Sequence, residues 1–465
     1  MTTLAPRFDP ALVARYDVNG PRYTSYPAAP QFHDRFGESE FRAAALASNE
    51  DPIPRQLSIY LHVPFCFSPC FYCGCTRVIT RDRGKADGYL ARLYREIEMV
   101  APLFDRDRPV VQLHLGGGTP NFLDARQMAE LIESLDRHFS FQRSDAREFG
   151  IEIDPRDVDP DYVRMLARHG FNRLSVGIQD FDPAVQAAVN RIQSVDETRA
   201  VIDAAREHGF RSVSVDLIYG LPKQTPASFA RTLEQVVALK PDRVATYGYA
   251  HLPERFKAQR QIDAGELPDA ATRLALLGLT IQTLTAAGYR YIGMDHFALP
   301  RDDLSRAQDH GTLQRNFQGY STHAACDLIG LGVSAIGRVG NHFVQNAKDL
   351  VGYYAALDSG RLPIARGMTL DADDLVRADL IQRLMCNGVL DIPAFEARHN
   401  LDFAVYFAAE CAALMKLAAD GIVVMTPDRI AATARGRPLL RIVAMCFDRY
   451  LARPGGVAAG YSKAL

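Results

Sequence analysis

Short apolar, β-branched runs alternate with stretches of helical periodicity between about residues 55 and 300. This alternation predicts repeated strand–helix units that build a parallel sheet. The predicted strands are Leu57–Val63, Val110–Leu115, Phe149–Ile153, Leu174–Ile178, Val213–Ile218, Val244–Tyr249 and Tyr291–Met294. Helical stretches such as Tyr89–Val100 and Phe229–Leu239 lie between them, and glycines such as Gly170 and Gly209 end helices before the next strand. We therefore expect an α/β fold with a (β/α) barrel or partial barrel, in which chemistry collects at the C-terminal ends of the strands.

Two further parts lie outside this alternating core. We predict an N-terminal arm, a barrel-like catalytic domain and a mainly helical C-terminal domain, at residues 1–50, 51–350 and 360–465 respectively. The arm is expected to be extended, because its aromatic segment Pro21–Pro27 contains few helix formers. In the C-terminal part the pattern predicts a hairpin at Gly421–Ala431 and a final helix from Arg437 to Tyr450.

The chain has 465 residues, of which 48% are hydrophobic and 23% charged, so it can bury a large core in more than one domain. Its N-terminus lacks an apolar signal core, and no apolar run approaches membrane-spanning length. Eight cysteines without a secretory signal indicate a reducing compartment. We expect a cytoplasmic protein without a membrane partner.

Three arginines near the predicted last helix, Arg435, Arg437 and Arg441, raise the question of DNA binding through a winged helix. The formal net charge is −2, and no wider basic patch surrounds these residues. A solvated helix face explains them better, so we expect no nucleic-acid partner.

Polar or glycine-rich segments lie at the C-terminal end of each of the first six predicted strands. In chain order they are a cysteine-rich loop, Gly116–Pro120, Glu152–Pro155, Gln179–Asp180, Asp216 and Tyr249–His251. Turn residues are common at strand ends, so each segment alone is weak evidence for function. Because parallel strands end at the same edge of a sheet, the six segments together predict one functional site.

The cysteine loop contains Cys66, Cys70 and Cys73 in the spacing C-x3-C-x2-C, followed by Cys75. Three thiolates on one short loop suit three irons of a [4Fe–4S] cluster, because soft sulfur ligands favour iron–sulfur clusters. The set is one cysteine short of the usual four, so the fourth iron would be open to a small molecule. We interpret Cys75 as a non-ligand with a separate role.

Two other interpretations of the loop stay open. A structural zinc site could use all four thiolates, although such sites usually take ligands from two separated knuckles, and the next cysteine here is Cys326. Free thiols without a metal are the second alternative. Disulfides are disfavoured, since nothing marks a secreted chain.

At this point the sequence resembles the radical S-adenosylmethionine (SAM) superfamily, and within it the oxygen-independent coproporphyrinogen III oxidase family. The C-x3-C-x2-C spacing is shared by the whole superfamily, whereas the combination of motifs is far more specific. Besides the cysteine loop, the matching segments are Gly20–Pro27, Tyr60–Cys66, Leu115–Pro120, Ile151–Pro155, Gly177–Phe181, Asp216–Gln224, Gly293–Phe297 and Arg315–Tyr320. The resemblance covers nearly the whole chain.

The resemblance implies roles for individual residues. Cys66, Cys70 and Cys73 would hold the [4Fe–4S] cluster, with SAM on the open iron. The positions that match the family's contacts to this first SAM are Tyr60, Gly117, Glu152 and Ile336. The family binds a second SAM molecule nearby, and the matching positions are Tyr72, Gly118, Thr119, Gln179, Arg191, Asp216 and Ala250. Cys75 is also a family feature, and with Tyr60 and His62 it completes the set of candidate catalytic residues.

The chemistry of these residues fits the implied roles, although each has a plainer explanation. The glycines of 116–118 let a ligand approach the backbone, or they form a tight turn. Glu152 and Asp216 are acceptors for ribose hydroxyls or an ammonium group, or else a helix cap and a salt bridge. Arg191 can pair with a carboxylate, or lie on the surface. His62 could assist proton or electron transfer, or be a packed core residue.

The family resemblance implies oxidative decarboxylation of two propionates of coproporphyrinogen III to vinyls by a SAM-derived 5′-deoxyadenosyl radical, giving protoporphyrinogen IX in haem biosynthesis. It also implies a reducing electron donor such as flavodoxin or ferredoxin and an electron acceptor, and we expect a monomer. Because the substrate carries carboxylates, arginine clamps are expected, with Arg22 in the arm as a candidate. The alternatives are a haem-binding chaperone of the same superfamily and a cluster-bearing electron carrier. The long N-terminal segment and Cys75 disfavour the chaperone, and the ligand-type groups at six strand ends disfavour the carrier.

Overall fold

A computed structural model describes residues 5–323, 325–451, 461 and 463. Its centre is one 12-stranded sheet with the strand order β16-β15-β14-β13-β1-β4-β5-β6-β7-β8-β10-β9. Six neighbouring strands in this sheet are parallel: β1 (Leu57–Val63), β4 (Val110–Gly117), β5 (Glu148–Ile153), β6 (Arg173–Gln179), β7 (Ser212–Tyr219) and β8 (Arg243–Gly248). They correspond to the first six predicted strands, with ends that differ by two residues at most. The predicted α/β fold with a partial barrel is confirmed.

The sheet does not close into a barrel, because antiparallel strands extend it on both sides. On one side β10 (His296–Ala298) pairs antiparallel with β8 and with β9 (Arg290–Gly293), which is the seventh predicted strand. On the other side β13 (Asp327–Leu331) pairs parallel with β1, and three antiparallel strands follow: β14 (Ile336–Val339), β15 (His342–Asn346) and β16 (Ile364–Thr369). The chain pattern did not predict β13 to β16, whose short apolar runs are interrupted by glycine and polar residues.

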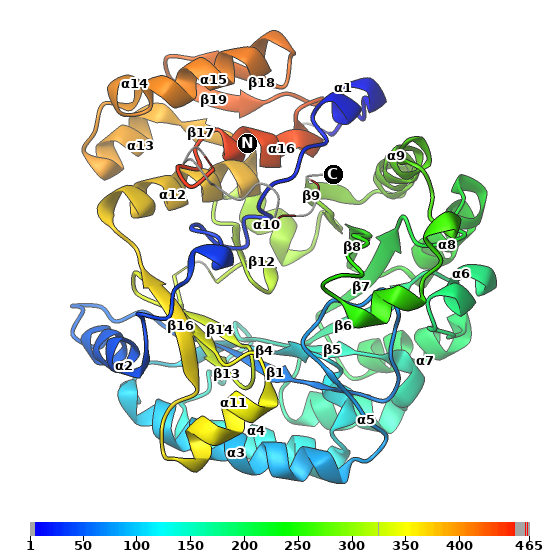
Figure 1. Ribbon diagram of the computed structural model, residues 1–465, viewed down its shortest axis with the longest axis vertical. Coiled ribbons are helices and arrows are strands. Elements are labelled where there is room, and N and C mark those ends of the chain that lie inside the picture. The colour runs from blue at the N-terminus through cyan, green and yellow to red at the C-terminus, as the bar shows by residue number, and fades with distance from the viewer. Residues whose placement is uncertain (1–4, 324, 452–460, 462, 464–465) are drawn as a thin grey trace.

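Helices between the strands lie outside the curved sheet (Figure 1). They are α3 (Gly84–Val100), α4 (Ala125–His138), α5 (Pro160–Arg168), α6 (Pro183–Ala188), α7 (Val195–Glu207), α8 (Pro226–Leu239), α9 (Ala270–Ala286) and α11 (Leu350–Asp358), whereas α10 (Asp303–Asp309) packs beside β9 in the middle of the molecule. Side-chain caps fix several of their starts; the Asp124 carboxylate accepts the Gln127 N–H, and the Gln127 side chain accepts the Asp124 N–H. Apolar residues such as Leu131 and Leu135 of α4 are fully buried against the sheet. This packing fixes the strand ends that carry the polar segments.

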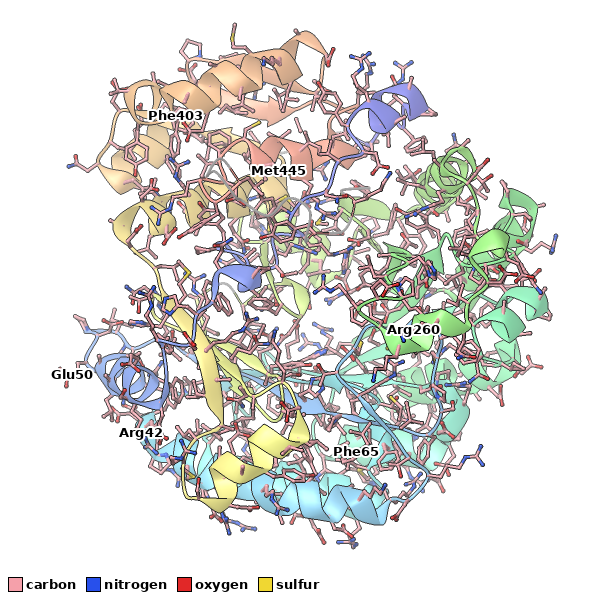
Figure 2. The ribbon with its side chains drawn as sticks, viewed as in Figure 1. Arg42, Glu50, Phe65, Arg260, Phe403 and Met445 are labelled. Atoms are coloured by element: carbon pink, nitrogen blue, oxygen red, sulfur yellow. The ribbon has the colours of Figure 1, made fainter. Side chains whose placement is uncertain are left out.

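The C-terminal part forms a second core. It contains α12 (Ala372–Asn387), α13 (Ile392–His399), α14 (Phe403–Tyr406), α15 (Ala408–Ala419) and α16 (Leu440–Met445), with a three-stranded sheet of β17 (Val389–Asp391), β19 (Arg429–Ala432) and β18 (Val423–Thr426). The β18–β19 pair lies at the predicted hairpin, whereas the predicted last helix is shorter and begins with a 3₁₀ turn at Arg437–Leu439. Figure 2 shows Phe403 and Met445 in this part and Phe65 in the sheet part. Two core clusters therefore hold the two parts.

The N-terminal arm connects both parts, and it is not wholly extended. It contains α1 (Pro10–Arg15), capped by Asp9, and α2 (Glu38–Ala47), with non-helical chain between them. The arm runs from α1 beside the C-terminal elements to α2 near β16 (Figure 1). His33 of the arm forms an antiparallel bridge with Gly367 of β16. Short helices at both ends thus attach an extended middle segment.

The solvated helix face predicted for the three C-terminal arginines is wrong. Arg437 and Arg441 are each only 3% exposed. The Arg441 Nε donates to the Pro21 carbonyl at 2.7 Å, and its Nη2 donates to the Gly20 carbonyl. Arg435 pairs with Asp9 at 2.7 Å. Arg435 and Arg441 therefore bind the arm, whereas Arg437 donates to the Tyr291 and Ile292 carbonyls. Backbone carbonyls supply acceptors that a side-chain pattern does not reveal.

No helix within the described residues is both long and apolar enough to cross a membrane.

Candidate active site

The cysteine loop follows β1, and two short strands close its base. These are β2 (Phe65–Cys66) and β3 (Val78–Ile79), which pair in parallel. Inside the loop, Arg77 donates to the Cys73 carbonyl at 2.9 Å and to the Cys70 carbonyl at 3.3 Å. One guanidinium therefore fixes the turn that carries two of the predicted cluster ligands.

All four cysteines of the loop line one cavity of about 280 Å³. The hydroxyl of Thr119 lies 3.3 Å from the Cys66 Sγ, and the backbone N–H of Cys75 lies 3.4 Å from the Cys73 Sγ. A hydrogen bond from Cys75 and the charge of Arg77 lower the pKa of the Cys73 thiol to about 6, although burial opposes this shift. Burial raises the pKa of Cys66 to about 11. The site thus favours a thiolate at Cys73, the form in which cysteine binds metal.

The thiols fit an iron–sulfur cluster better than a single metal ion. All eight cysteines of the chain are free thiols. Among the described residues, no group of three His, Cys, Asp or Glu side chains is arranged to hold one metal ion. In a cluster each thiolate binds a different iron, so the three sulfurs need not converge on one point. The donor set therefore suits a [4Fe–4S] cluster, and it lacks the convergence that a zinc site requires.

The glycine run at the end of β4 forms a wall of the same cavity without side chains. Gly117 has φ +116°, and a Cβ there would lie 2.7 Å from the His62 ring. A Cβ on Gly118 would lie 2.7 Å from the Phe65 carbonyl oxygen. Any larger residue would displace β1 or the start of the cysteine loop, so these positions leave room for a ligand against the backbone.

A buried ion-pair cluster lies beside Cys70. The Asp154 Oδ2 accepts from Arg191 at 3.0 Å and from Arg156 at 2.6 Å. Arg191 also donates to the Gly177 carbonyl at 2.6 Å, and its Nη1 lies 3.6 Å from the Cys70 Sγ. Burial alone would raise the pKa of Asp154, but the two guanidiniums lower it overall. Arg191 is 6% exposed, so the surface explanation for it is wrong.

Two carboxylates project into the cavity from β5 and β7, the strands on either side of β6. Glu152 of β5 pairs with the His114 Nε2 at 3.2 Å, and Asp216 of β7 accepts from the Ser175 hydroxyl at 3.2 Å. Burial and the charge of Glu152 raise the pKa of Asp216 to about 7. Neither carboxylate caps a helix. The Asp216 Oδ1 and the remaining lone pairs of the Glu152 oxygens are acceptors for a polar ligand.

Tyr60 and His62 lie on β1, behind the glycine wall. The Tyr60 hydroxyl is 3.1 Å from the His62 Nδ1, and the His62 Nε2 is 3.0 Å from the Thr76 carbonyl. The Tyr60 ring stacks on His114 with centroids 6.1 Å apart. Burial lowers the pKa of His62, which keeps the imidazole neutral at pH 7. Neither side chain lines the cysteine cavity, but His62 lies against Gly117 and Tyr60 against His114.

The structure brings together most of the site residues predicted from the sequence. Those that line the cysteine cavity are Cys66, Cys70, Tyr72, Cys73, Cys75, Gly117, Gly118, Thr119, Glu152, Gln179, Arg191 and Asp216. Ala250 lines a neighbouring cavity instead. Ile336 packs in an apolar cluster of β14, although its backbone lies against Gly330, the residue that pairs with Tyr60.

Several polar residues of the site were not assigned from the sequence. They are Arg77, His114, Asp154, Arg156, Ser175 and Tyr247. His114, Ser175 and Tyr247 share one signal, since each is a polar position facing inward on a strand next to an assigned carboxylate. Arg77 and Arg156 are loop residues whose partners are backbone carbonyls or a nearby aspartate, and no spacing rule identifies them.

The chain resembles known proteins over almost its full length. A model of the radical SAM superfamily matches residues 60–236, and a model of the HemN C-terminal domain matches residues 370–439. A protein of Pseudomonas aeruginosa named oxygen-independent coproporphyrinogen III oxidase is 51% identical over 445 residues, which cover 96% of each chain. The Escherichia coli K12 protein of the same name is 48% identical over 444 residues, again 96% of each chain. The solved structure described as coproporphyrinogen III oxidase (HemN) from Escherichia coli, a radical SAM enzyme, superposes with a TM-score of 0.90 at 45% identity, over 96% of this chain and all of that one.

Proposed function

The chain belongs to the oxygen-independent coproporphyrinogen III oxidase family of the radical SAM superfamily, and we propose that it converts two propionates of coproporphyrinogen III into vinyl groups. The product is protoporphyrinogen IX, and the reaction is an oxidoreductase step of haem biosynthesis that needs no oxygen. The observation that carries this proposal is the cavity in which three free thiols of a C-x3-C-x2-C loop meet a glycine wall and two carboxylates.

Membership of the superfamily implies a [4Fe–4S] cluster and SAM. When bound, the cluster supplies a reducing electron, and SAM supplies the radical that abstracts a hydrogen atom from the substrate. Cys66, Cys70 and Cys73 would hold the cluster, because they are the thiols grouped on the loop that Arg77 fixes. Cys75 is exposed and directs its N–H toward the Cys73 Sγ, a position suited to a group that acts beside the ligands.

The walls of the cavity would bind and orient SAM. The glycine wall lets the ligand approach the backbone at Gly117. Glu152 offers carboxylate oxygens for an ammonium group or ribose hydroxyls. Tyr60 of β1 and Ile336 of β14 both lie next to Gly330 of β13. We propose that they contact the same SAM molecule. His62, held neutral, could move a proton at Nδ1, which faces the Tyr60 hydroxyl.

A second SAM molecule is part of the proposal. The residues proposed to bind it are Tyr72, Gly118, Thr119, Gln179, Arg191, Asp216 and Ala250. All but Ala250 line the cysteine cavity. Arg191 is the cation for the SAM carboxylate, since its guanidinium is held in place by Asp154 and Gly177. Asp216 is the acceptor for ribose hydroxyls.

The proposed reaction also needs two electron-transfer partners. A reducing donor such as flavodoxin or ferredoxin would supply the electron, and an acceptor would take up the electron left after decarboxylation. Free thiols throughout the chain support work in the reducing cytoplasm. The arm, the catalytic domain and the C-terminal domain would occupy residues 1–50, 51–350 and 360–465, with one chain sufficient for activity.

The test is an anaerobic assay with reconstituted cluster, SAM, a reductant and coproporphyrinogen III, followed by mass analysis. Two hydrogen abstractions per substrate require about two molecules of 5′-deoxyadenosine and two of carbon dioxide per protoporphyrinogen IX. A three-carboxylate intermediate should appear early. Haem binding without SAM dependence and without loss of carbon dioxide would show a haem carrier instead of an enzyme.

A further inference from the structure

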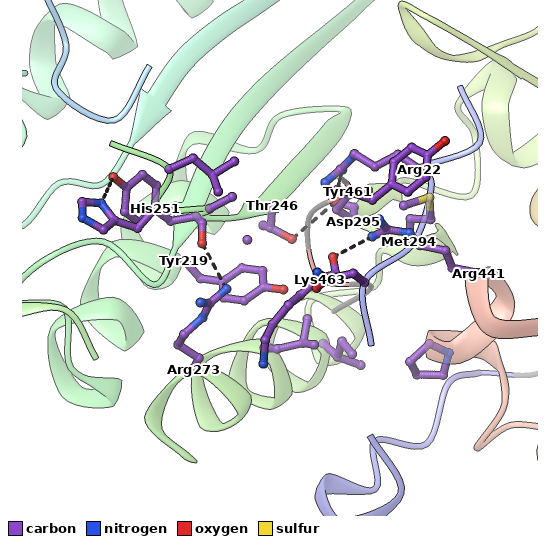
Figure 3. A pocket seen from close by; sticks show the side chains of 18 of the residues that line it. Arg22, Tyr219, Thr246, His251, Arg273, Met294, Asp295, Arg441, Tyr461 and Lys463 are labelled. Atoms are coloured by element: carbon purple, nitrogen blue, oxygen red, sulfur yellow. Dashed lines mark hydrogen bonds and ion pairs between the residues drawn. The ribbon is translucent and has the colours of Figure 1, made fainter. Parts of the chain in front are cut away.

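A second cavity, of about 340 Å³, lies beside the proposed active site. Its walls come from several separate parts of the chain. Figure 3 shows Arg22 of the arm, Tyr219 at the end of β7, Arg273 of α9, Met294 and Asp295 between β9 and β10, and Arg441 of α16. No motif of the sequence marks this cavity as a whole.

The two cavities are neighbours. Tyr247 lines the cysteine cavity, and the Arg22 guanidinium lies over the Tyr247 ring, 5.6 Å from its centroid. Arg22 itself lines the second cavity. A ligand longer than either cavity could therefore contact both, with Arg22 between them.

The second cavity combines apolar walls with cationic groups. Its apolar and aromatic lining includes Tyr219, Tyr249, Leu277, Ile281, Tyr291 and Met294. Arg22, Arg273 and Arg441 add guanidiniums, and Asp295 is the only carboxylate among the described lining residues. This combination matches a flat apolar ring system that carries acidic side chains.

Positive charge exceeds negative charge around Asp295. Arg22 forms an ion pair with Asp295. Arg315 is 6% exposed and donates through Nε to the Arg22 carbonyl at 3.4 Å, but its Nη1 has no hydrogen-bond partner. Arg273 donates to the Tyr249 carbonyl at 3.0 Å and forms no ion pair with any described residue. A buried guanidinium without an anion is costly, so this region favours an anionic ligand.

We propose that this cavity binds the propionate carboxylates of the tetrapyrrole that are not reacting, while the reacting propionate lies in the cysteine cavity. Arg273, which is half-buried, supplies the cation for one carboxylate. Arg22 supplies the second, shared with Asp295 in the ligand-free protein and transferred to the substrate on binding. The proposal rests on the proposed function, since it takes the substrate class from it.

The test measures binding of coproporphyrin III, the stable oxidised analogue of the substrate, to the full chain with reconstituted cluster and without reductant. Porphyrin fluorescence gives the dissociation constant. The tetramethyl ester of the same porphyrin is the neutral control ligand. The wild-type protein should bind the tetra-acid at least tenfold more tightly than the ester, because only the acid pairs with the arginines.

Arg273→Gln should weaken binding of the tetra-acid about tenfold or more and leave binding of the ester nearly unchanged. Arg273→Lys keeps the charge and should recover part of the loss. The matched control is Arg260→Gln: Arg260 is exposed, donates to the Pro253 carbonyl at 3.1 Å and does not line the cavity. A melting temperature close to that of the wild type would show that each variant is folded.

The outcomes separate this inference from the proposed function. Equal affinity of the wild type for acid and ester, or an Arg273→Gln variant that binds the acid like the wild type, would overturn the inference even if carbon dioxide release is normal. Absence of carbon dioxide release with an intact acid preference would instead refute the proposed function and leave a carboxylate site in place.

Discussion

Two buried arginine–aspartate clusters lie on either side of the proposed substrate path, and they are built differently. Beside Cys70, Asp154 binds Arg156 and Arg191, all within consecutive strand–helix units of the sheet part. Beneath the arm, Asp295 binds Arg22, a partner that lies 273 residues away along the chain. The first cluster needs only the sheet part to form. The second exists only when the arm is in place, so it can respond to a ligand while the first stays fixed.

The largest expected effect is loss of the iron–sulfur cluster, while the cavity beneath the arm stays intact. Cys66→Ala, Cys70→Ala and Cys73→Ala should each lose the cluster and all turnover, since a methyl group cannot replace a thiolate ligand. Cys75→Ser should keep the cluster and lose turnover. Iron content and absorbance measure the cluster, and coproporphyrin III binding reports on the arm side, which should stay intact. Comparable iron loss in Cys75→Ser would show that the division into three ligands and one other residue is wrong.

The next largest effect is a loss of stability, which should differ between substitutions of the two aspartates. Asp154→Ala leaves two buried guanidiniums without a carboxylate, and it should lower the free energy of unfolding by about 3–5 kcal/mol. Asp295→Ala should cost less, about 1–2 kcal/mol, because the side chain of its partner Arg22 is 35% exposed. Urea unfolding of the full chain measures both. Equal losses would contradict the idea that only the first cluster is a fixed part of the fold.

A smaller effect concerns ligand binding next to the fixed cluster. Arg191→Ala and Asp216→Ala should weaken SAM binding about ten- to hundredfold, because each removes a charged partner of the ligand. The absorbance of the cluster should remain, since neither residue is a thiol. Equilibrium dialysis with labelled SAM gives affinity and stoichiometry. If both variants bind two SAM molecules with normal affinity, the assignment of these residues to the second SAM fails.

The smallest effect is a dependence of stability on pH. The pKa of Asp216 is raised to about 7 in the folded protein, so between about pH 4 and 7 the folded state holds a proton that the unfolded state has lost. Stability of the ligand-free protein should therefore fall as pH rises through this window, by roughly 1 kcal/mol per pH unit. Burial also raises the pKa of Glu96 to about 7, so Asp216→Asn should reduce this slope without abolishing it. Melting temperatures between pH 5 and 7 test it, and an unchanged slope in the variant would assign the titration to another group.

The difference between the two clusters also explains how far the sequence could predict the structure. The strands from Leu57 to Gly248 and the cysteine loop carry local signals, namely β-branched runs, turn residues and cysteine spacing. Glu152 and Asp216 could be assigned because strand ends meet at one edge of a sheet. The buried state of Arg437 and Arg441 could not, because their acceptors are backbone carbonyls from distant segments.

The same limit applies to the arm and to the second cavity. The arm was predicted as extended, yet α1 and α2 form where they pack on other parts of the protein, which local propensity does not describe. Asp295 and Arg315 lie in segments that match the family, but nothing in their spacing relates them to Arg22. Contacts between segments hundreds of residues apart require the folded chain.

The bonds from Arg441 to the carbonyls of Gly20 and Pro21 set an order for assembly during translation. Pro21 leaves the ribosome 420 residues before the guanidinium that binds it. Domains fold as they emerge, so the sheet part with its cysteine loop can form while the arm is still unattached. The cavity beneath the arm therefore stays open until Arg441 has emerged, and the arm is attached after the sheet part has folded.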